Sequence, residues 1–167
     1  MPPDGTASRT GIGYDSHRFA AGRPMVLGGV KIDSTVGLRG HSDADAVAHA
    51  LTDAILGAAC AGDIGSMFPD SDPANEGRDS MEMLSLAVRR VEALGFRVMH
   101  SDITVIAEAP RIGPYRSAMC EALARACGVP AGFISVKGKT NEGMGWIGQG
   151  EGLACIAVAT LAEVPQR

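Results

Sequence analysis

The sequence predicts an α+β fold in which helices pack on one face of a single mixed β-sheet. Five segments are rich in β-branched residues and bordered by glycine or proline, which is typical of strands. Three other segments carry apolar residues at helical spacing. The two kinds of segment do not alternate strictly, so helices layered on one sheet fit the pattern better than a doubly wound fold.

The expected strands are short and are separated by turn-forming residues. They cover 9–14, 25–32, 96–107, 133–137 and 152–161. Three helices can cover only one face of such a sheet, and few residues remain to cover the other. We therefore expect the chain to self-associate through its second sheet face.

Each expected helix has recognisable ends. The first begins with Ser42 as N-cap, followed three residues later by Asp45 in a capping-box pattern. The second starts at residue 79 or 80 and ends at Gly95, and its apolar stripe indicates a purely structural role. The third begins near Pro114, whose fixed φ suits a first helical turn, and ends at Gly128.

The composition predicts one domain and excludes several classes of protein. With 167 residues, 46% hydrophobic and 20% charged, the chain can bury one core, which we place at 9–167 after a short flexible N-terminus, 1–8. A net charge of −4 and 4% aromatic residues argue against a nucleic-acid partner. No apolar run is long enough to span a membrane, and the four scattered cysteines follow no secretory signal, which predicts a cytoplasmic protein.

Asp15 and His17 are the first candidate metal ligands. They are two residues apart after a predicted strand, so both side chains can leave the same face. His41 or His49, in the first helical segment, could complete a three-ligand site whose open fourth position suits zinc chemistry. Alternatively, His49 belongs to a solvated helix stripe with the aspartates one turn to either side. Spacing alone leaves both interpretations open.

Two glycine patterns near the C-terminus match nucleotide-binding motifs only superficially. The GxGxxG string at 143–148 has too little chain after it to build a dinucleotide-binding unit. The Gly-Lys-Thr at 138–140 lacks the first glycine of a Walker A loop, because Phe133 stands there. The loop 137–142 nevertheless combines cationic, hydroxyl and carboxylate groups, which suit phosphate and a divalent cation. An ordinary surface turn is the alternative.

Segments along nearly the whole chain, 11–161, resemble the 2-C-methyl-D-erythritol 2,4-cyclodiphosphate synthases of the non-mevalonate isoprenoid pathway. So many matches in the same order are far more specific than any single motif. The segments that carry the resemblance are 15–17, 40–45, 49–54, 62–65, 68–73, 107–110, 140–142 and 150–152.

The resemblance assigns the metal ligands. It implies that Asp15, His17 and His49 hold Zn²⁺, and that Glu142 holds a second divalent cation, Mg²⁺ or Mn²⁺, together with the substrate phosphates. His41 would then face the substrate, as would Ser42 at a helix N-terminus that favours an anion. His41 and Thr140 are implied to stabilise the transition state.

The resemblance also implies the reaction. 4-Diphosphocytidyl-2-C-methyl-D-erythritol 2-phosphate would give the 2,4-cyclodiphosphate and CMP in a phosphorus–oxygen lyase reaction, because its own 2-phosphate attacks the β-phosphorus. The resemblance further implies a homotrimer in which each active site combines the metal residues of one subunit with a cytidine side that comes largely from the next. A metal-dependent phosphoesterase or a catalytically silent metal-binding trimer is the alternative.

The remaining substrate contacts are also implied by the resemblance. The segments 63–65 and 68–72 would hold the methylerythritol part, and 107–113 the cytosine. The residues expected to contact the substrate are Asp15, Ser16, His17, His41, Ser42, Asp63, Ile64, Gly65, Phe68, Pro69, Asp70, Ser71, Asp72, Ala107, Glu108, Ala109, Pro110, Arg111, Ile112, Gly113, Lys139, Thr140, Asn141, Glu142, Trp146 and Gln149.

Three positions depart from the common family pattern. Gln149 stands where many members have arginine, which removes a bidentate phosphate donor and argues against binding of an isoprenoid diphosphate in a central trimer cavity. Trp146 stands where phenylalanine is frequent, and Lys139 replaces a common threonine. We hypothesise that Lys139 supplies the positive charge that Gln149 lacks.

Overall fold

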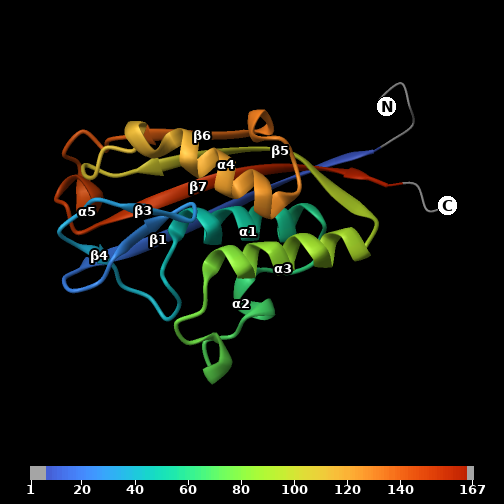
Figure 1. Cartoon of the computed structure of the whole chain (residues 1–167), viewed down its shortest axis with the longest axis horizontal. Helices are drawn as coiled ribbons and strands as arrows, with labels where there is room; N and C mark the ends of the chain where they lie inside the picture. The colour runs from blue at the N-terminus through green and yellow to red at the C-terminus, as the bar shows by residue number, and fades with distance from the viewer. Residues whose placement is uncertain (1–6, 165–167) are drawn as a thin grey trace.

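A five-stranded sheet forms the centre of the computed structural model, which describes residues 7–164 (Figure 1). Its strands are β1 (Ser8–Ala20), β4 (Gly37–Leu38), β5 (Phe96–Ile106), β6 (Ile134–Lys139) and β7 (Gly152–Glu163). They lie in the order β4, β1, β7, β5, β6. Within 7–164, only β5 and β6 pair in parallel and the other neighbours are antiparallel. The sheet is therefore mixed, as predicted.

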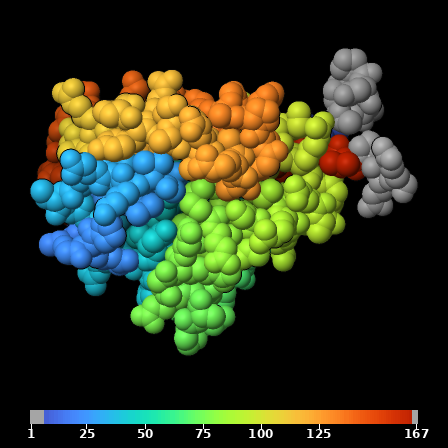
Figure 2. All heavy atoms as spheres, in the orientation of Figure 1, coloured from blue at the N-terminus to red at the C-terminus, as the bar shows by residue number. Residues whose placement is uncertain are grey.

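Three long helices cover one face of this sheet. They are α1 (Ala46–Ala58), α3 (Ser80–Ala93) and α4 (Arg116–Cys127). Figure 2 shows this face, where α3 in green and α4 in orange hide most of the strands behind them. The buried apolar side chains lie between these helices and the sheet. The predicted α+β fold, with helices on one face of a mixed sheet, is confirmed.

Shorter elements connect these layers. They are the hairpin strands β2 (Met25–Leu27) and β3 (Val30–Ile32), the single-turn helices α2 (Ile64–Met67) and α5 (Gly145–Gly148), and the 3-10 turns Pro73–Asn75, Gly113–Tyr115 and Ala131–Phe133. α2 and the first 3-10 turn lie in the long connection between α1 and α3 (Figure 1). This connection borders the site described below.

Two predicted elements differ in the structure. The segment 25–32 is a separate two-stranded hairpin and no part of the main sheet, because Gly28 and Gly29 take φ values of 58° and 72° and turn the chain back on itself. The first helix begins after Asp45, whose Oδ1 accepts hydrogen bonds from Val47 N and Ala48 N at 3.1 Å. Ser42 is therefore not the N-cap. The expected capping box failed because a better acceptor follows three residues later.

The second face of the sheet keeps an apolar surface. Ile12 and Tyr14 point away from the helices and are 70% and 56% exposed, and Val158, paired with Ile12 across β1 and β7, is 36% exposed. Of the expected flexible N-terminus, residues 1–6 lie outside the described residues, and Ser8 already pairs with Ala162. Among residues 7–164, no helix has the length and apolar character needed to cross a membrane.

Candidate metal centre

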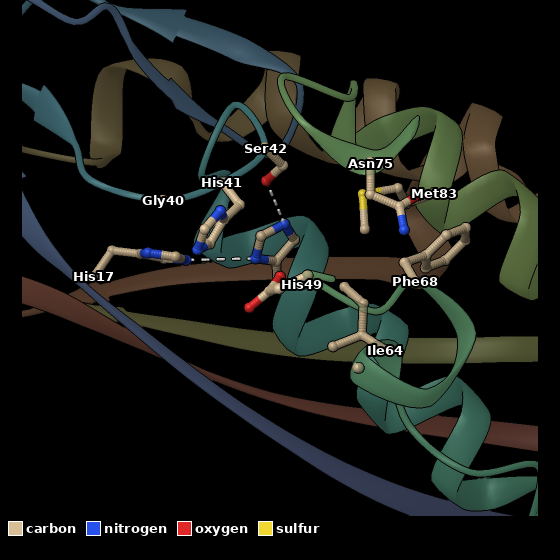
Figure 3. A pocket seen from close by; sticks show the side chains of 11 residues that line it. His17, Gly40, His41, Ser42, His49, Ile64, Phe68, Asn75 and Met83 are labelled. Carbon is tan, nitrogen blue, oxygen red and sulfur yellow. Dashed lines mark hydrogen bonds between the residues drawn. The ribbon is translucent and has the colours of Figure 1, made fainter. Parts of the chain in front are cut away.

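Three candidate ligands, Asp15, His17 and His49, converge where β1 packs against α1. Figure 3 shows the rings of His17 and His49 pointing toward each other. Asp15 and His17 project from the same face of β1, as their spacing predicted, and His49 lies on the first turn of α1. The Nε2 atom of His17 is 2.8 Å from Asp15 Oδ2, and His49 Nδ1 is 3.2 Å from that oxygen. The two ring nitrogens are 3.4 Å apart. The interpretation of His49 as part of a solvated stripe is wrong, because its ring faces inward and the preceding Asp45 is completely buried.

Glycines on β1 let α1 come close enough to complete this group. A Cβ atom on Gly13 would lie 1.9 Å from the carbonyl oxygen of Ala50, and one on Gly11 would lie 2.1 Å from that of Ala54. No side chain fits between the strand and the helix at these two positions. The backbone contact therefore sets the separation between Asp15 and His49.

The outer nitrogens of both histidines are hydrogen bonded. His17 Nδ1 lies 2.7 Å from the carbonyl oxygen of Arg39, an acceptor, so Nδ1 carries the hydrogen and donates it. His49 Nε2 lies 2.8 Å from Ser80 Oγ and 3.1 Å from Ser42 Oγ. Hydrogen bonds at the outer nitrogens orient a metal-binding histidine and fix its tautomer.

The charges in the triad are strongly coupled. Burial acts to raise the pKa of Asp15, but the hydrogen bonds that His17 and His49 donate when their rings carry both hydrogens outweigh it and hold that pKa well below its usual range. Burial acts in the opposite direction on His17, and the bond to Asp15 overcomes it and raises the pKa of His17. The inward-facing atoms thus attract positive charge to one point.

This donor set fits a divalent metal ion. Two imidazole nitrogens and one carboxylate oxygen are ligand types that Zn²⁺ accepts, and their three ligand atoms lie within 4.8 Å of one another. Electron pairs aimed at one point repel each other unless a cation lies between them. Three protein ligands leave a fourth position for an oxygen of a substrate or water.

A cavity of about 240 Å³ opens beside the triad. Figure 3 shows the three histidines on one side of it and Ile64, Phe68 and Met83 on the other. Besides His17 and His49, six residues that were predicted to contact the substrate line this cavity: His41, Ser42, Ile64, Gly65, Phe68 and Asp70. Its lining residues are His17, Gly40, His41, Ser42, His49, Ile64, Gly65, Phe68, Asp70, Asn75 and Met83.

Four predicted contacts from the same segments do not line this cavity. Asp63 accepts a hydrogen bond from Ser66 N and caps α2, and Asp72 caps the following 3-10 turn. Pro69 and Ser71 are exposed next to Asp70. Local caps thus occupy two of the carboxylates that were expected to accept from substrate hydroxyls.

A second cavity, of about 640 Å³, holds most of the predicted cytosine contacts. Within the described chain it shares no lining residue with the cavity beside the triad. Ala109 is exposed and is the one residue of 107–113 that does not line it. The lining residues are Ala107, Glu108, Pro110, Arg111, Ile112, Gly113, Pro114, Arg116, Gly138, Lys139 and Thr140.

The predicted ligand Glu142 lies in a turn beside this second cavity. Thr140 Oγ1 donates to Glu142 Oε1 at 2.8 Å. Glu108 Oε1 accepts from Asn141 N at 2.8 Å and Gly143 N at 3.3 Å, which fixes the turn. Among residues 7–164, the one group of three or more possible metal ligands is the triad, and Glu142 is not part of it.

The residues that depart from the family pattern lie apart from the triad. Trp146 is 40% exposed on α5, and Gln149 caps the end of that helix.

A third cavity, of about 570 Å³, shares His17 and His41 with the cavity beside the triad and lies next to an ion pair in which Arg18 and Glu151 are 3.0 Å apart. Its lining residues are Ser16, His17, Arg18, Arg23, Arg39, Gly40 and His41.

Several residues of the site were missed by the sequence. Asn75 and Met83 line the cavity, and Ser80 contacts His49, although its helix was expected to be purely structural. A buried serine at the start of a helix that already has Asp79 as N-cap is the only signal that pointed to this role. That signal becomes visible only once burial is known.

Comparisons with known proteins agree with this geometry. The YgbB family profile matches residues 8–162. The 2-C-methyl-D-erythritol 2,4-cyclodiphosphate synthase of Gemmatimonas aurantiaca is 58% identical over 156 residues, which cover 93% of this chain and 94% of that one. A solved cyclodiphosphate synthase in a CDP-bound form has a TM-score of 0.84 at 41% identity, covering 92% of this chain and 99% of that one. The bifunctional IspDF of Campylobacter jejuni has a TM-score of 0.91 at 41% identity, covering 95% of this chain and 43% of that one.

The fold and the triad define an α+β protein with three candidate metal ligands beside a cavity of about 240 Å³. The profile match spans nearly the whole described chain, and relatives at 58% and 52% identity are named 2-C-methyl-D-erythritol 2,4-cyclodiphosphate synthase. The chain belongs to the YgbB family, that of the 2-C-methyl-D-erythritol 2,4-cyclodiphosphate synthases. The resemblance inferred from the sequence is confirmed.

Proposed function

We propose that the protein converts 4-diphosphocytidyl-2-C-methyl-D-erythritol 2-phosphate to 2-C-methyl-D-erythritol 2,4-cyclodiphosphate and CMP, as a phosphorus–oxygen lyase of the non-mevalonate isoprenoid pathway. The observation that carries the proposal is the convergence of Asp15, His17 and His49 beside a cavity in a chain of this family. The CDP bound to a structural relative supports a cytidine diphosphate substrate.

The reaction needs no nucleophile from the protein. An oxygen of the 2-phosphate forms a bond to the β-phosphorus, the bond from that phosphorus to the bridging oxygen breaks, and CMP leaves with the electron pair. Because the nucleophile is tethered to its target, the protein must hold the two in line and offset the developing charge. Asp15, His17 and His49 would hold Zn²⁺, which would supply a Lewis acid for a phosphate oxygen.

The segment 40–42 places His41 at the mouth of the cavity beside the triad, which we call the metal cavity. Arg23 donates to the carbonyl oxygens of Gly40 at 2.7 Å and Ser42 at 2.8 Å, which fixes the loop. His41 lines both the metal cavity and the third cavity, which Arg18, Arg23 and Arg39 also line. We assign His41 and Thr140 to the charge that develops on the phosphates.

Glu142 is the proposed protein ligand of a second cation. One carboxylate combined with substrate phosphates is a typical environment for Mg²⁺, and Mn²⁺ accepts similar ligands. The bond from Thr140 and the Glu108 clamp on the turn hold the Glu142 carboxylate near the second cavity. This position of Glu142 supports a cation on the cytidine side of the substrate.

A homotrimer explains how the two halves of the site meet. Within one chain the metal cavity and the second cavity are separate, and the sheet keeps an apolar face. A trimer packed on that face covers it, and neighbouring subunits supply the two halves of each active site. We place this assembly in the cytoplasm, with no nucleic-acid or membrane partner.

Phosphorus NMR of the purified protein with the diphosphocytidyl substrate, Zn²⁺ and Mg²⁺ tests the proposed function. The expected products are a cyclic diphosphate and CMP, and the Asp15→Asn variant should form neither above background. A linear phosphate product without CMP would show a metal-dependent phosphoesterase. Absence of turnover by a protein that binds Zn²⁺ would show a catalytically silent scaffold.

A further inference from the structure

We propose that Ser80, the first residue of α3, is a positioning residue of the metal centre, and that Asp43 acts through it to fix the tautomer of His49. The inference rests on the proposed function only in taking Asp15, His17 and His49 as the metal ligands. It gives α3 a part in the chemistry of the site.

Ser80 lies between a carboxylate and the outer nitrogen of His49. Its side chain is completely buried. Its Oγ is 2.8 Å from His49 Nε2 and donates a hydrogen bond to Asp43 Oδ1. The Ser80 backbone N donates to the other oxygen of Asp43 at 3.2 Å, so the carboxylate holds this residue at two points.

Counting hydrogens along this chain of contacts fixes the protonation of His49. An ionised carboxylate only accepts hydrogen bonds, so the single hydroxyl hydrogen of Ser80 points to Asp43 Oδ1. Ser80 Oγ is then an acceptor toward His49, and Nε2 must carry the hydrogen that this oxygen accepts at 2.8 Å. Ser42 Oγ, at 3.1 Å from Nε2, is the second hydroxyl that can accept from the same nitrogen. His49 Nδ1 is left with a free electron pair, and this is the atom that faces Asp15 Oδ2 at 3.2 Å and His17 Nε2 at 3.4 Å.

To remain an acceptor toward a histidine nitrogen, a serine hydroxyl needs a second partner that takes its own hydrogen. A backbone carbonyl needs no such partner. Arg39 O accepts from His17 and can do nothing else, because a carbonyl has no hydrogen. A serine hydroxyl with no partner could turn and donate to His49 Nε2, which would move the ring hydrogen to Nδ1 and into the metal site. The bond to Asp43 prevents that rotation.

A purely structural role explains these contacts less well. α3 already has an N-cap, because Asp79 accepts from Met81 N at 2.8 Å. The loop before α1 is also tied to the start of α3 by backbone bonds from Gly77 N to His41 O at 2.7 Å and from Asp43 N to Arg78 O at 3.2 Å. Neither the helix end nor the loop needs the Ser80 hydroxyl.

Zinc affinity of the full chain, measured by competition with a chromophoric chelator, is the first test. We expect Ser80→Ala to weaken Zn²⁺ binding about 10-fold to 100-fold, the usual cost of losing a hydrogen-bond partner of a metal ligand. The matched control is Ser85→Ala on the same helix, whose hydroxyl only bonds to Met81 O. Affinity of the Ser80→Ala variant within about twofold of the wild-type value, outside the range for such partners, would overturn the proposal.

A tautomer measurement separates positioning from folding. Long-range ¹H–¹⁵N NMR of the metal-free protein above pH 8 should show His49 protonated on Nε2 only. Ser80→Ala should give a mixture of tautomers, and Ser80→Thr, which keeps the hydroxyl, should restore the single form. Wild-type His49 protonated on Nδ1 would overturn the inference.

Asp43→Ala decides the matter if Ser80→Ala does not fold. Because Oδ1 of Asp43 also accepts from Asp45 N, an asparagine would keep its oxygen there, so Asp43→Ala is the informative variant. Alanine removes the acceptor of the Ser80 hydroxyl, which is then free to turn toward His49, and we expect weaker Zn²⁺ binding and mixed tautomers. Wild-type binding by this variant would count against the relay. Because these measurements use no substrate, the inference can hold although no CMP is formed, and it can fail although the cyclisation is confirmed.

Discussion

Lys139 is the residue through which this chain departs most usefully from its family's common pattern. It ends β6 and lines the second cavity with Arg111 and Thr140, whereas Gln149 caps α5 and does not line that cavity. An ammonium group in a cavity that binds a diphosphate contributes charge that an amide cannot. The position of Lys139 therefore agrees with the hypothesis drawn from the sequence.

We expect Lys139→Ala to raise KM for the diphosphocytidyl substrate by about 10-fold, the cost of one charge-assisted hydrogen bond. Gln149→Ala should change KM by less than about twofold, because this exposed amide makes at most a surface contact. Steady-state kinetics on both variants, with Zn²⁺ and Mg²⁺ saturating, gives the comparison. Equal effects would contradict the hypothesis.

The sequence could predict single site residues only where their neighbours in the chain decide the geometry. Asp15 and His17 share a strand, so their common face follows from a spacing of two. Choosing His49 over His41 required the resemblance, because the helix start depends on which of several acceptors caps it. Ser80 was out of reach, because its contact with His49 depends on how α3 packs against the loop before α1.

At the scale of elements, the contact between β1 and α1 decides whether the metal centre forms. Gly13 sits under Ala50, and the ligands Asp15 and His49 lie on either side of this contact. A methyl group at Gly13 has no free space, so the helix must lift or the strand must bend. The metal site and the stability of the fold therefore depend on the same glycine.

We expect Gly13→Ala to lower the free energy of unfolding by about 2 kcal/mol or more, as overpacking against backbone does, and to weaken Zn²⁺ binding. Gly57→Ala is the matched control. Gly57 is exposed on α1, the helix that packs against Gly13, and nothing lies within 4 Å of an added Cβ. That change should stabilise the protein by about 0.5–1 kcal/mol through helix propensity. Urea unfolding and chelator competition measure both effects, and unchanged zinc affinity in Gly13→Ala would contradict this coupling.

Asp45 joins α1 to the hairpin β2–β3. Besides capping the helix, its carboxylate accepts from Gly28 N at 2.8 Å and Gly29 N at 2.7 Å. Burial raises the pKa of Asp45 from 3.8 to about 6, which the bonds from the glycine N–H groups only partly oppose. The folded protein therefore holds a proton at Asp45 more tightly than the unfolded chain does.

The contribution of Asp45 to the free energy of unfolding depends on pH. Between about pH 4 and pH 6 the folded state keeps the proton of Asp45 and the unfolded state loses it, so this group's contribution to stability falls as pH rises through that window. Asp45→Asn cannot titrate. Both unfolding free energies are measured in urea with chelator present. The value for wild type minus the value for Asp45→Asn should decrease from pH 4 to pH 7. A difference that grows would contradict a raised pKa.

The sequence predicted elements well where periodicity decides and poorly where a turn does. The apolar spacing of α3 and α4 and the β-branched content of β5 and β7 identified these elements close to their observed bounds. The segment 25–32 looks continuous as a strand, but two glycines at positive φ fold it into a hairpin. The strand at Gly37–Leu38, only two residues long, has no pattern of its own.

For the whole molecule, an exposed apolar sheet face and two cavities that share no lining residue lead to the same expectation. Ile12, Tyr14 and Val158 lie together on that face. If three chains pack on it, light scattering after size exclusion should give three times the 17.2 kDa of one chain. Tyr14→Glu should shift the protein toward monomer, whereas Leu94→Glu, at an apolar residue of similar exposure beside α3, should not. A wild-type monomer would rule out the trimer.

Mixing two inactive variants tests whether neighbouring chains share the active site. His49→Ala removes the metal half, and Glu142→Gln removes the proposed second cation, so each homotrimer should be inactive. When the two are unfolded together and refolded at equal amounts, each site draws its halves from two chains at random, and about a quarter of the sites should be intact. We expect CMP release at about a quarter of the wild-type rate on this statistical basis. If both halves come from one chain, no mixture regains activity, because every chain carries one defect.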